Sequence, residues 1–532
     1  MSLSLPRLFP LLLFVMASPG LSQQAGDAPT DSAAPVPEVQ AEGEAEAPDM
    51  AEIEEAWRRG DYVFVRRGLK RLAEEAGTGQ AQYRYGRVLV EGRGGPRDIH
   101  GAVDWLTKAS EQNVVEAATL LARIYLSGPP DGPERDPVQA ARLLSRSAAR
   151  GDAEAQYYLG LLYRAGTGVD QDPASSYNWF LAAAENGHVA AQYELSRALS
   201  RGEGTALDTD EALRWLRRAA EGGHVQAQYF LALALDSGRG APQDRDAALD
   251  WVRRAAEAGF LPAQRVLGEK YLVGDGVEPQ PAETLRWLET AADTGDSRSQ
   301  YLLARAYLGE GGVPPNGGEA LQLLKAASDA GYGPATTRLA QLQETGEAGL
   351  APDLEGAVAL YRKAEAQGDA AAAVRLGVLA GEGSLDGLAA PHAAVPWAIA
   401  AAEQGDAGAL DWVRGQAEEG LRPARTAYGI WLLAHEGDPE EAAGLLLKAA
   451  EAGDVRAQFR YGELLSTGTG VAQDYAAAHM WMNIAAASGS SQAAQRRDVL
   501  SDLMTPEQVA DAQRAARVHF DRMAAEPPVT SQ

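Results

Sequence analysis

Apolar residues recur every three or four positions along most of the chain, in pairs of short segments separated by glycine. Residues 151–187 contain one such pair, with small or apolar residues first at Ala155, Leu159 and Leu162 and then at Ser176, Trp179 and Ala183. This spacing is typical of amphipathic helices. Asp152 and Asp172 precede the two segments and can cap the helices, and Pro173 suits a first helical position. The pattern predicts two helices joined as a hairpin.

The hairpin recurs through the chain. A small residue marks one position of the first helix at intervals of thirty-six residues, at Ala155, Ala191, Ala227, Ala263, Ser299 and Ala335. Further copies are marked by Ala81, Ala117, Ala372, Ala409, Ala424, Ala457 and Ala493. A single hairpin cannot bury its apolar stripe alone, so successive hairpins must stack. We therefore predict an all-α fold, an α/α solenoid or superhelix of helical hairpins without β-strands.

Composition narrows the range of partners. Of the 532 residues, 74 are acidic and 48 are basic, which gives a formal net charge of −26. Nucleic acids and anionic membranes are bound by basic surfaces, so we expect neither as a partner. The sequence contains no cysteine, which excludes disulfides, thiolate metal sites and cysteine nucleophiles.

The N-terminal segment has the features of an export signal. Arg7 precedes an apolar run from Leu8 to Ala17, and small residues shortly after it favour cleavage before Gln23. We predict a signal peptide over residues 1–22, a periplasmic or secreted protein, and no membrane insertion after cleavage. Residues 23–48 are rich in alanine, proline and glutamate and lack basic residues, so we expect a disordered acidic linker there.

The repeats divide the rest of the chain. A partial repeat begins near Met50, and we expect a continuous array of hairpins over residues 49–404. Residues 405–420 contain one helical pattern without a partner, which predicts an irregular junction helix that disturbs the stacking. Further repeats and a capping helix are expected over residues 421–526, where Thr505–Gln508 can form a capping box with proline at the first helical position.

The repeated unit resembles the Sel1-like repeat family, a relative of the tetratricopeptide repeats. In one copy the signature residues are Ala155, Leu159, Gly160, Tyr163, Gly166, Gly168, Val169, Asp172, Trp179, Ala183 and Ala184. The resemblance covers about residues 50–525, and Met504–Gln513 is similar to the closing segment of exported proteobacterial members. It implies a Sel1-like, tetratricopeptide-like solenoid that gathers protein partners as an adaptor. One secreted branch of the family is cysteine-rich, with reported affinity for β-lactams, and this chain departs from it.

Three recurrent features are candidate sites, and the first two have structural explanations. Glycine-rich loops such as Gly202–Asp208 precede the second helices, but they join helix to helix and no Gly-Lys-Ser/Thr sequence occurs, so we expect turns rather than phosphate sites. His188 and His224 occupy equivalent positions of neighbouring repeats. Equivalent points on stacked helices lie about 10 Å apart, too far for two ligands of one zinc ion.

The third feature is a row of aromatic residues. Eight of the ten tryptophans occupy one position of the second helix, namely Trp105, Trp179, Trp215, Trp251, Trp287, Trp397, Trp412 and Trp481. Such a row can serve as a ligand platform, but its recurrence from repeat to repeat favours a place in the hairpin core.

No catalytic constellation such as HExxH, GxSxG or SxxK is present. We therefore assign no catalytic, cofactor-binding or metal-binding residue and do not expect an enzyme, and the sequence does not identify partner-binding residues. Three functions stay open. The first is a scaffold that binds a protein partner through its concave, first-helix surface in cell-envelope assembly or signalling. The second is a glycan- or peptidoglycan-binding module in polysaccharide export, and the third is a hydrolase of cell-wall or β-lactam substrates. We favour the first.

Overall fold

The computed structural model describes residues 48–525. The predicted signal peptide, residues 1–22, lies outside the described residues, as does nearly all of the predicted linker, residues 23–48. Both stay predictions.

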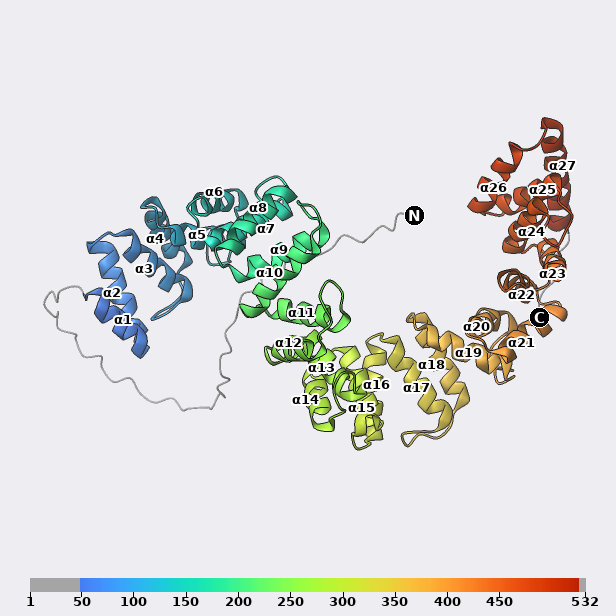
Figure 1. Ribbon diagram of the computed structural model, residues 1–532, viewed down its shortest axis with the longest axis horizontal. Coiled ribbons are helices and arrows are strands. Elements are labelled where there is room, and N and C mark those ends of the chain that lie inside the picture. Colours follow the sequence, from blue (N-terminus) through green and yellow to red (C-terminus); the bar gives the residue numbers. More distant parts are fainter. Residues whose placement is uncertain (1–47, 526–532) are drawn as a thin grey trace, which may run out of the picture. The chain divides into compact units, whose positions relative to one another are not determined.

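The described residues form 27 α-helices and one short 3-10 helix, with no β-strand (Figure 1). The prediction of an all-α fold of repeated helical hairpins is therefore confirmed. The chain divides into two compact units, the first ending at Ala263 and the second beginning at Gln264.

The helices of the first unit are nearly uniform in length. They are α1 (Met50–Arg59), α2 (Tyr62–Glu75), α3 (Gly79–Glu91), α4 (Ile99–Glu111), α5 (Val115–Ser127), α6 (Pro137–Ala148), α7 (Ala153–Ala165), α8 (Pro173–Glu185), α9 (Val189–Arg201), α10 (Thr209–Glu221), α11 (Val225–Ser237) and α12 (Arg245–Glu257). The division between the units falls within α13 (Leu261–Val273).

The second unit continues the series. Its helices are α14 (Pro281–Ala292), α15 (Ser297–Tyr307), η1 (Glu310–Gly312), α16 (Gly317–Asp329), α17 (Gly333–Thr345), α18 (Leu354–Ala366), α19 (Ala370–Gly381), α20 (Pro391–Glu403), α21 (Ala407–Glu418), α22 (Arg422–Ala434), α23 (Pro439–Glu451), α24 (Val455–Thr467), α25 (Tyr475–Ala487), α26 (Ser491–Ser501) and α27 (Pro506–Ala525). In α27, Thr505 and Gln508 form the predicted capping box through reciprocal hydrogen bonds.

Several hairpins have a glycine in the first helix, which lets the second helix approach. In the hairpin of α7 and α8, a Cβ on Gly160 would lie 2.7 Å from the ring of Phe180, which is almost fully buried. The hydroxyl of Ser176 donates a hydrogen bond of 2.9 Å to the carbonyl oxygen of Gly160. Gly86 receives Leu106 in the same way. The Leu-Gly pair of the sequence signature is therefore a packing requirement.

Aspartates and glycines set the helix ends, as the sequence predicts. Asp172 caps α8 by accepting hydrogen bonds from the N–H groups of Ala174 and Ser175. The second glycine of some loops before the second helices has an additional role. A Cβ on Gly204, which has a φ of +75°, would collide with the carbonyl oxygen of Pro173 at the start of α8. Only glycine satisfies both the left-handed backbone and this approach.

A recurrent glutamine ties several hairpins to the preceding one. Gln156, one residue after the marker alanine of α7, is buried, and its side chain donates a hydrogen bond of 3.1 Å to the carbonyl oxygen of Ala148. Gln228 and Gln458 make the equivalent bonds to Ala220 and Ala450. These bonds satisfy carbonyl groups at the ends of the second helices, which have no partner within their own helix.

The single helix α21 lies inside the second unit and packs against α19, α20 and α22. Ala409, Val413 and Ala417 form its buried face. The prediction that this segment acts as a junction stays a prediction. Within the described residues, no helix combines the length and the apolar character needed to cross a bilayer.

Candidate functional site: the first-helix face

Each hairpin has a first and a second helix. In the first unit, the first helices are α3, α5, α7, α9 and α11. In the second unit they are α15, α17, α19, α22, α24 and α26. We call the outward side of these helices the first-helix face. In the second unit, outward residues of α24 and α26 border a shallow groove lined by Phe459, Arg460, Glu463, Gln492, Gln495, Arg496 and Val499.

Successive first helices are linked by a ladder of paired side chains. The residue two positions after the marker residue contacts the residue that directly precedes the next first helix. In the first unit these pairs are Thr119 with Asp152, Tyr157 with His188, Tyr193 with His224, and Tyr229 with Phe260. In the second unit they are Arg265 with Asp296, Tyr301 with Tyr332, and Thr337 with Asp369. The same two positions are in contact in all of these repeats, but the contact is a hydrogen bond in some, an ion pair in one and an aromatic pair in others.

The two histidines singled out in the sequence are members of this ladder. His188 and His224 are the N-caps of α9 and α11, where each Nδ1 accepts a hydrogen bond from a backbone N–H. Burial lowers the pKa of both imidazoles, although Asp152 near His188 and Glu194 near His224 act in the opposite direction. Their lone pairs are thus committed to helix capping. Within the described residues, no group of three histidine, aspartate or glutamate side chains is arranged to hold a metal ion.

Ion pairs form a second link across the first-helix face. Arg123 pairs with Glu154 of the next first helix at 2.9 Å. In the second unit, Arg375 binds Glu344. Burial alone would raise the pKa of Glu344, but hydrogen bonds from Arg375 and Tyr361 hold it below its usual value. An exposed pair such as Arg123 with Glu154 contributes little stability and chiefly fixes the register of neighbouring repeats.

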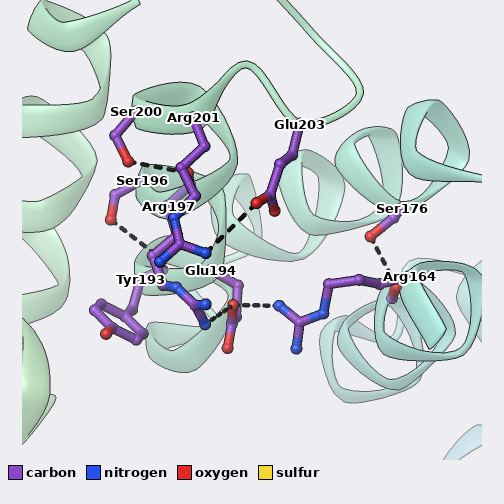
Figure 2. A network of polar contacts seen from close by, with 10 residues as sticks. Arg164, Ser176, Tyr193, Glu194, Ser196, Arg197, Ser200, Arg201 and Glu203 are labelled. Atoms are coloured by element: carbon purple, nitrogen blue, oxygen red, sulfur yellow. Dashed lines mark hydrogen bonds and ion pairs between the residues drawn. The ribbon is translucent and has the colours of Figure 1, made fainter. Parts of the chain in front are cut away.

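One cluster on this face has more positive than negative charge. Figure 2 shows Glu194 between Arg164 of α7 and Arg197 of its own helix, at 2.5 and 3.0 Å. The carboxylate is largely buried, with 12% of its side chain exposed, whereas the two arginines are 39% and 35% exposed. Arg201 pairs separately with Glu203. Because two guanidinium groups share one carboxylate, this cluster keeps one positive charge.

Next to the cluster lies an exposed apolar pair. Phe230 and Leu233 stand one turn apart on α11, with 45% and 37% of their surface exposed. The ring of Phe230 stacks on that of Tyr193 at 6.3 Å. On the same tyrosine, the guanidinium of Arg197 lies 5.8 Å from the ring centroid. Tyr193 thus joins the apolar pair to the charged cluster.

A family comparison agrees with the repeated geometry. The model of the Sel1 repeat matches eleven segments, at residues 79–114, 115–152, 153–188, 189–224, 225–260, 261–296, 297–332, 333–369, 370–406, 427–454 and 455–490. The chain belongs to the Sel1 repeat family. Residues 407–426, which include α21, lie between two matched Sel1 repeats.

Solved structures show the same architecture. A protective antigen present in uropathogenic Escherichia coli strains, which displays an SLR fold, is 28% identical, with a TM-score of 0.57. The match covers 86% of this chain and 95% of that one. A Sel1 repeat protein from Oxalobacter formigenes is also 28% identical over 46% of this chain and all of its own, with a TM-score of 0.43. No curated protein matches the sequence.

The tryptophan row of the Sel1 repeats packs against the core, but not uniformly. Four of the eight tryptophans are buried, namely Trp215, Trp287, Trp397 and Trp481, and the other four are half-buried. Cations lie over several of the rings, as with Arg218 on Trp215 at 4.6 Å and Lys108 on Trp105 at 4.2 Å. The residue that fills the hairpin is the next one along, such as Phe180 after Trp179. The predicted core position of the tryptophans is therefore confirmed for four of them, while in the hairpin of α7 and α8 the residue after Trp179 is the more deeply buried one.

Sequence reasoning missed the residues that distinguish one Sel1 repeat from another. Phe230 and Leu233 belong to an apolar segment of α11 and cannot be told apart from core residues by composition alone. One signal was available. Both lie three and six residues after the marker Ala227, positions that hold Glu194 and Arg197 in the preceding repeat. A comparison with the preceding repeat would have marked them, although α7 also carries apolar residues at these positions, Tyr158 and Leu161.

Proposed function

We propose that this protein is an exported scaffold that holds a protein partner against its first-helix face, in assembly or signalling at the cell envelope. The observation that carries the proposal is the exposed pair Phe230 and Leu233, set beside a charged cluster on a surface otherwise linked by ion pairs. Adjacent exposed apolar side chains with a polar rim are typical of interaction sites. The function is binding, and the protein needs no catalytic residue for it.

Membership of the Sel1 repeat family supports a binding role, because stacked repeats build an extended surface with room for a partner. Export is supported by the predicted signal peptide over residues 1–22. The description of the similar Escherichia coli protein as a protective antigen is in keeping with it.

Site-specific photo-crosslinking in growing cells tests this function. Benzoylphenylalanine is placed at position 233 of α11 and, as a matched control, at position 138 of α6. Val138 is 49% exposed but lies on a second helix. We expect a discrete protein adduct from position 233 and none from position 138. Adducts of equal yield from both positions, or none from position 233, would contradict the proposal.

A further inference from the structure

The outward surface of α11 differs from those of its neighbours. Three and six residues after the marker alanine, α11 carries the exposed pair Phe230 and Leu233. In α3 and α9, the same positions hold charged residues, namely Arg84, Arg87, Glu194 and Arg197. In α7 the two positions hold Tyr158 and Leu161, but those side chains are half-buried. The charged residues of α3 and α9 show that the repeat architecture does not require an apolar residue here. Phe230 contacts Tyr193 and Tyr229, yet 45% of its surface stays exposed.

The charged cluster beside Phe230 and Leu233 is positive. Arg164 and Arg197 share the carboxylate of Glu194, which cannot neutralise both (Figure 2). Each guanidinium is more than a third exposed and retains N–H donors for another acceptor. Arg197 and Phe230 contact the same ring, that of Tyr193. A ligand that covers Phe230 therefore comes within reach of a cation.

We propose that this surface, formed by Phe230, Leu233, Tyr193, Arg197 and Arg164, binds a short acidic and apolar peptide segment of a partner protein. An aromatic or aliphatic side chain of the peptide covers Phe230 and Leu233, and a carboxylate a few residues away accepts hydrogen bonds from Arg197 and Arg164. The inference rests on the proposed scaffold function and names the chemistry of the partner.

The overall charge of the protein sharpens this description. With a formal net charge of −26, the chain repels a strongly acidic partner at long range. On this surface, attraction comes from the cluster around Glu194, where two guanidinium groups share one carboxylate. The bound segment therefore carries one or two acidic residues next to its apolar anchor rather than an acidic run. Charge-assisted hydrogen bonds to carboxylates supply the specificity, and burial of the anchor supplies most of the affinity.

The test is a selection of displayed random twelve-residue peptides on the immobilised full chain. It compares wild type with Leu233→Lys and Leu233→Glu, which remove the same apolar group but add opposite charges. Phe230→Ser removes the main apolar contact. Val138→Ser and Arg123→Gln are controls, since one removes an exposed apolar residue elsewhere and the other removes an arginine that has a carboxylate of its own. Far-UV circular dichroism melts verify that each variant is folded.

We expect wild type and both controls to enrich peptides with an apolar residue within four positions of aspartate or glutamate. Phe230→Ser should lower recovery of these peptides at least tenfold, and Leu233→Lys should retain at least ten times more than Leu233→Glu. Equal binding to all variants would overturn this site while leaving a scaffold function in place. Enrichment of basic peptides would overturn the assigned chemistry. If no peptide is enriched, and an oligosaccharide array binds instead, both the site and the scaffold function fail.

Discussion

The imidazole of His188 stacks on the phenol ring of Tyr157 with the ring centroids 4.5 Å apart, while its Nδ1 accepts a 3.1 Å hydrogen bond from the N–H of Ala191. His224 and Tyr193 repeat the arrangement one hairpin later, with centroids 4.4 Å apart. The same histidine thus caps its own helix and packs against the preceding repeat. A proton on Nδ1 would remove the acceptor, so capping requires the neutral imidazole with its hydrogen on Nε2.

This geometry predicts that the first unit loses stability in mild acid. Burial lowers the pKa of His188 and His224 in the folded protein below the value of about 6.5 found in an unfolded chain. The unfolded state therefore binds more protons as the pH falls. The contribution of the two neutral caps is fully present above about pH 6.5, and it is lost as the pH drops from there towards the folded pKa.

Urea unfolding of the full chain at pH 7.5 and pH 5.5 measures the effect. We expect a lower free energy of unfolding at pH 5.5 in wild type and a smaller loss in the double variant His188→Asp/His224→Asp. Aspartate caps the equivalent helix at Asp152. An aspartate side chain has an ordinary pKa of about 3.9, so the substituted caps carry the same charge at both pH values. His479 and His519, whose pKa values are also lowered by burial, remain in the variant and leave a residual loss. If the variant lost as much free energy of unfolding between pH 7.5 and pH 5.5 as wild type, the histidine caps would not be the groups that titrate.

The fold could be predicted because the same pattern of apolar residues recurs in many repeats. The marker residues Ala155, Ala191 and Ala227 are all fully buried, as their regular spacing implies. The pattern does not show which of two adjacent apolar residues in a helical turn is the more deeply buried. Trp179 and Phe180 are adjacent and both apolar, and periodicity alone cannot resolve a rotation of about 100° between them. Phe230 was missed because apolar periodicity identifies core residues and has no means of marking an exposed one.

The shift from Trp179 to Phe180 has a measurable consequence. Phe180 is 2% exposed and rests on Gly160, whereas Trp179 is half-buried. Phe180→Ala should therefore destabilise the first unit by about 3–5 kcal/mol, the usual cost of removing a buried aromatic ring. Trp179→Ala should cost less, because solvent already reaches part of the indole. Urea denaturation of the two variants compares them directly, and a larger loss for Trp179→Ala would contradict the packing described above.

Gly204 and Gly240 allow backbone strain to be separated from close packing. Both have positive φ angles, +75° and +76°, at equivalent loop positions. A Cβ on Gly204 would collide with the backbone of Pro173, while a Cβ on Gly240 would have no atom within 4 Å. Gly240→Ala should cost about 1–2 kcal/mol for the left-handed conformation alone. Gly204→Ala should cost clearly more, and equal thermal shifts would mean that the loop moves away without penalty.

Export is tested by the mature N-terminus. The predicted signal peptide over residues 1–22 implies that the protein recovered from the periplasm or medium begins at or near Gln23. Replacing the apolar run Leu8–Ala17 with polar residues should leave an unprocessed chain in the cytoplasm. If wild type itself retains Met1, the proposed role at the cell envelope no longer stands.

The helix α21 offers the sharpest test of how the array holds together. It has no hairpin partner, and it contributes one buried face through Ala409, Val413 and Ala417. Its interior also contains Gly415, and an interior glycine costs a helix about 1 kcal/mol relative to alanine. Stability in a repeat array is a sum of unit terms and nearest-neighbour interface terms, so this unit should open more readily than a complete hairpin.

Hydrogen exchange followed by mass spectrometry resolves the point. Amides of α21 should exchange faster than those of α9, which belongs to a complete hairpin. A Cβ at Gly415 would have no atom within 4 Å, so Gly415→Ala should add about 1 kcal/mol of helix stability and slow exchange in α21 by about fivefold. Gly381→Ala is the opposite control, because its Cβ would lie 2.5 Å from the backbone nitrogen of Ala409 and should weaken the seating of α21. Equal protection of α9 and α21 in wild type would show that the single helix is as stable as a helix of a complete hairpin. That result would contradict the prediction that α21 is a junction that can adjust to a partner.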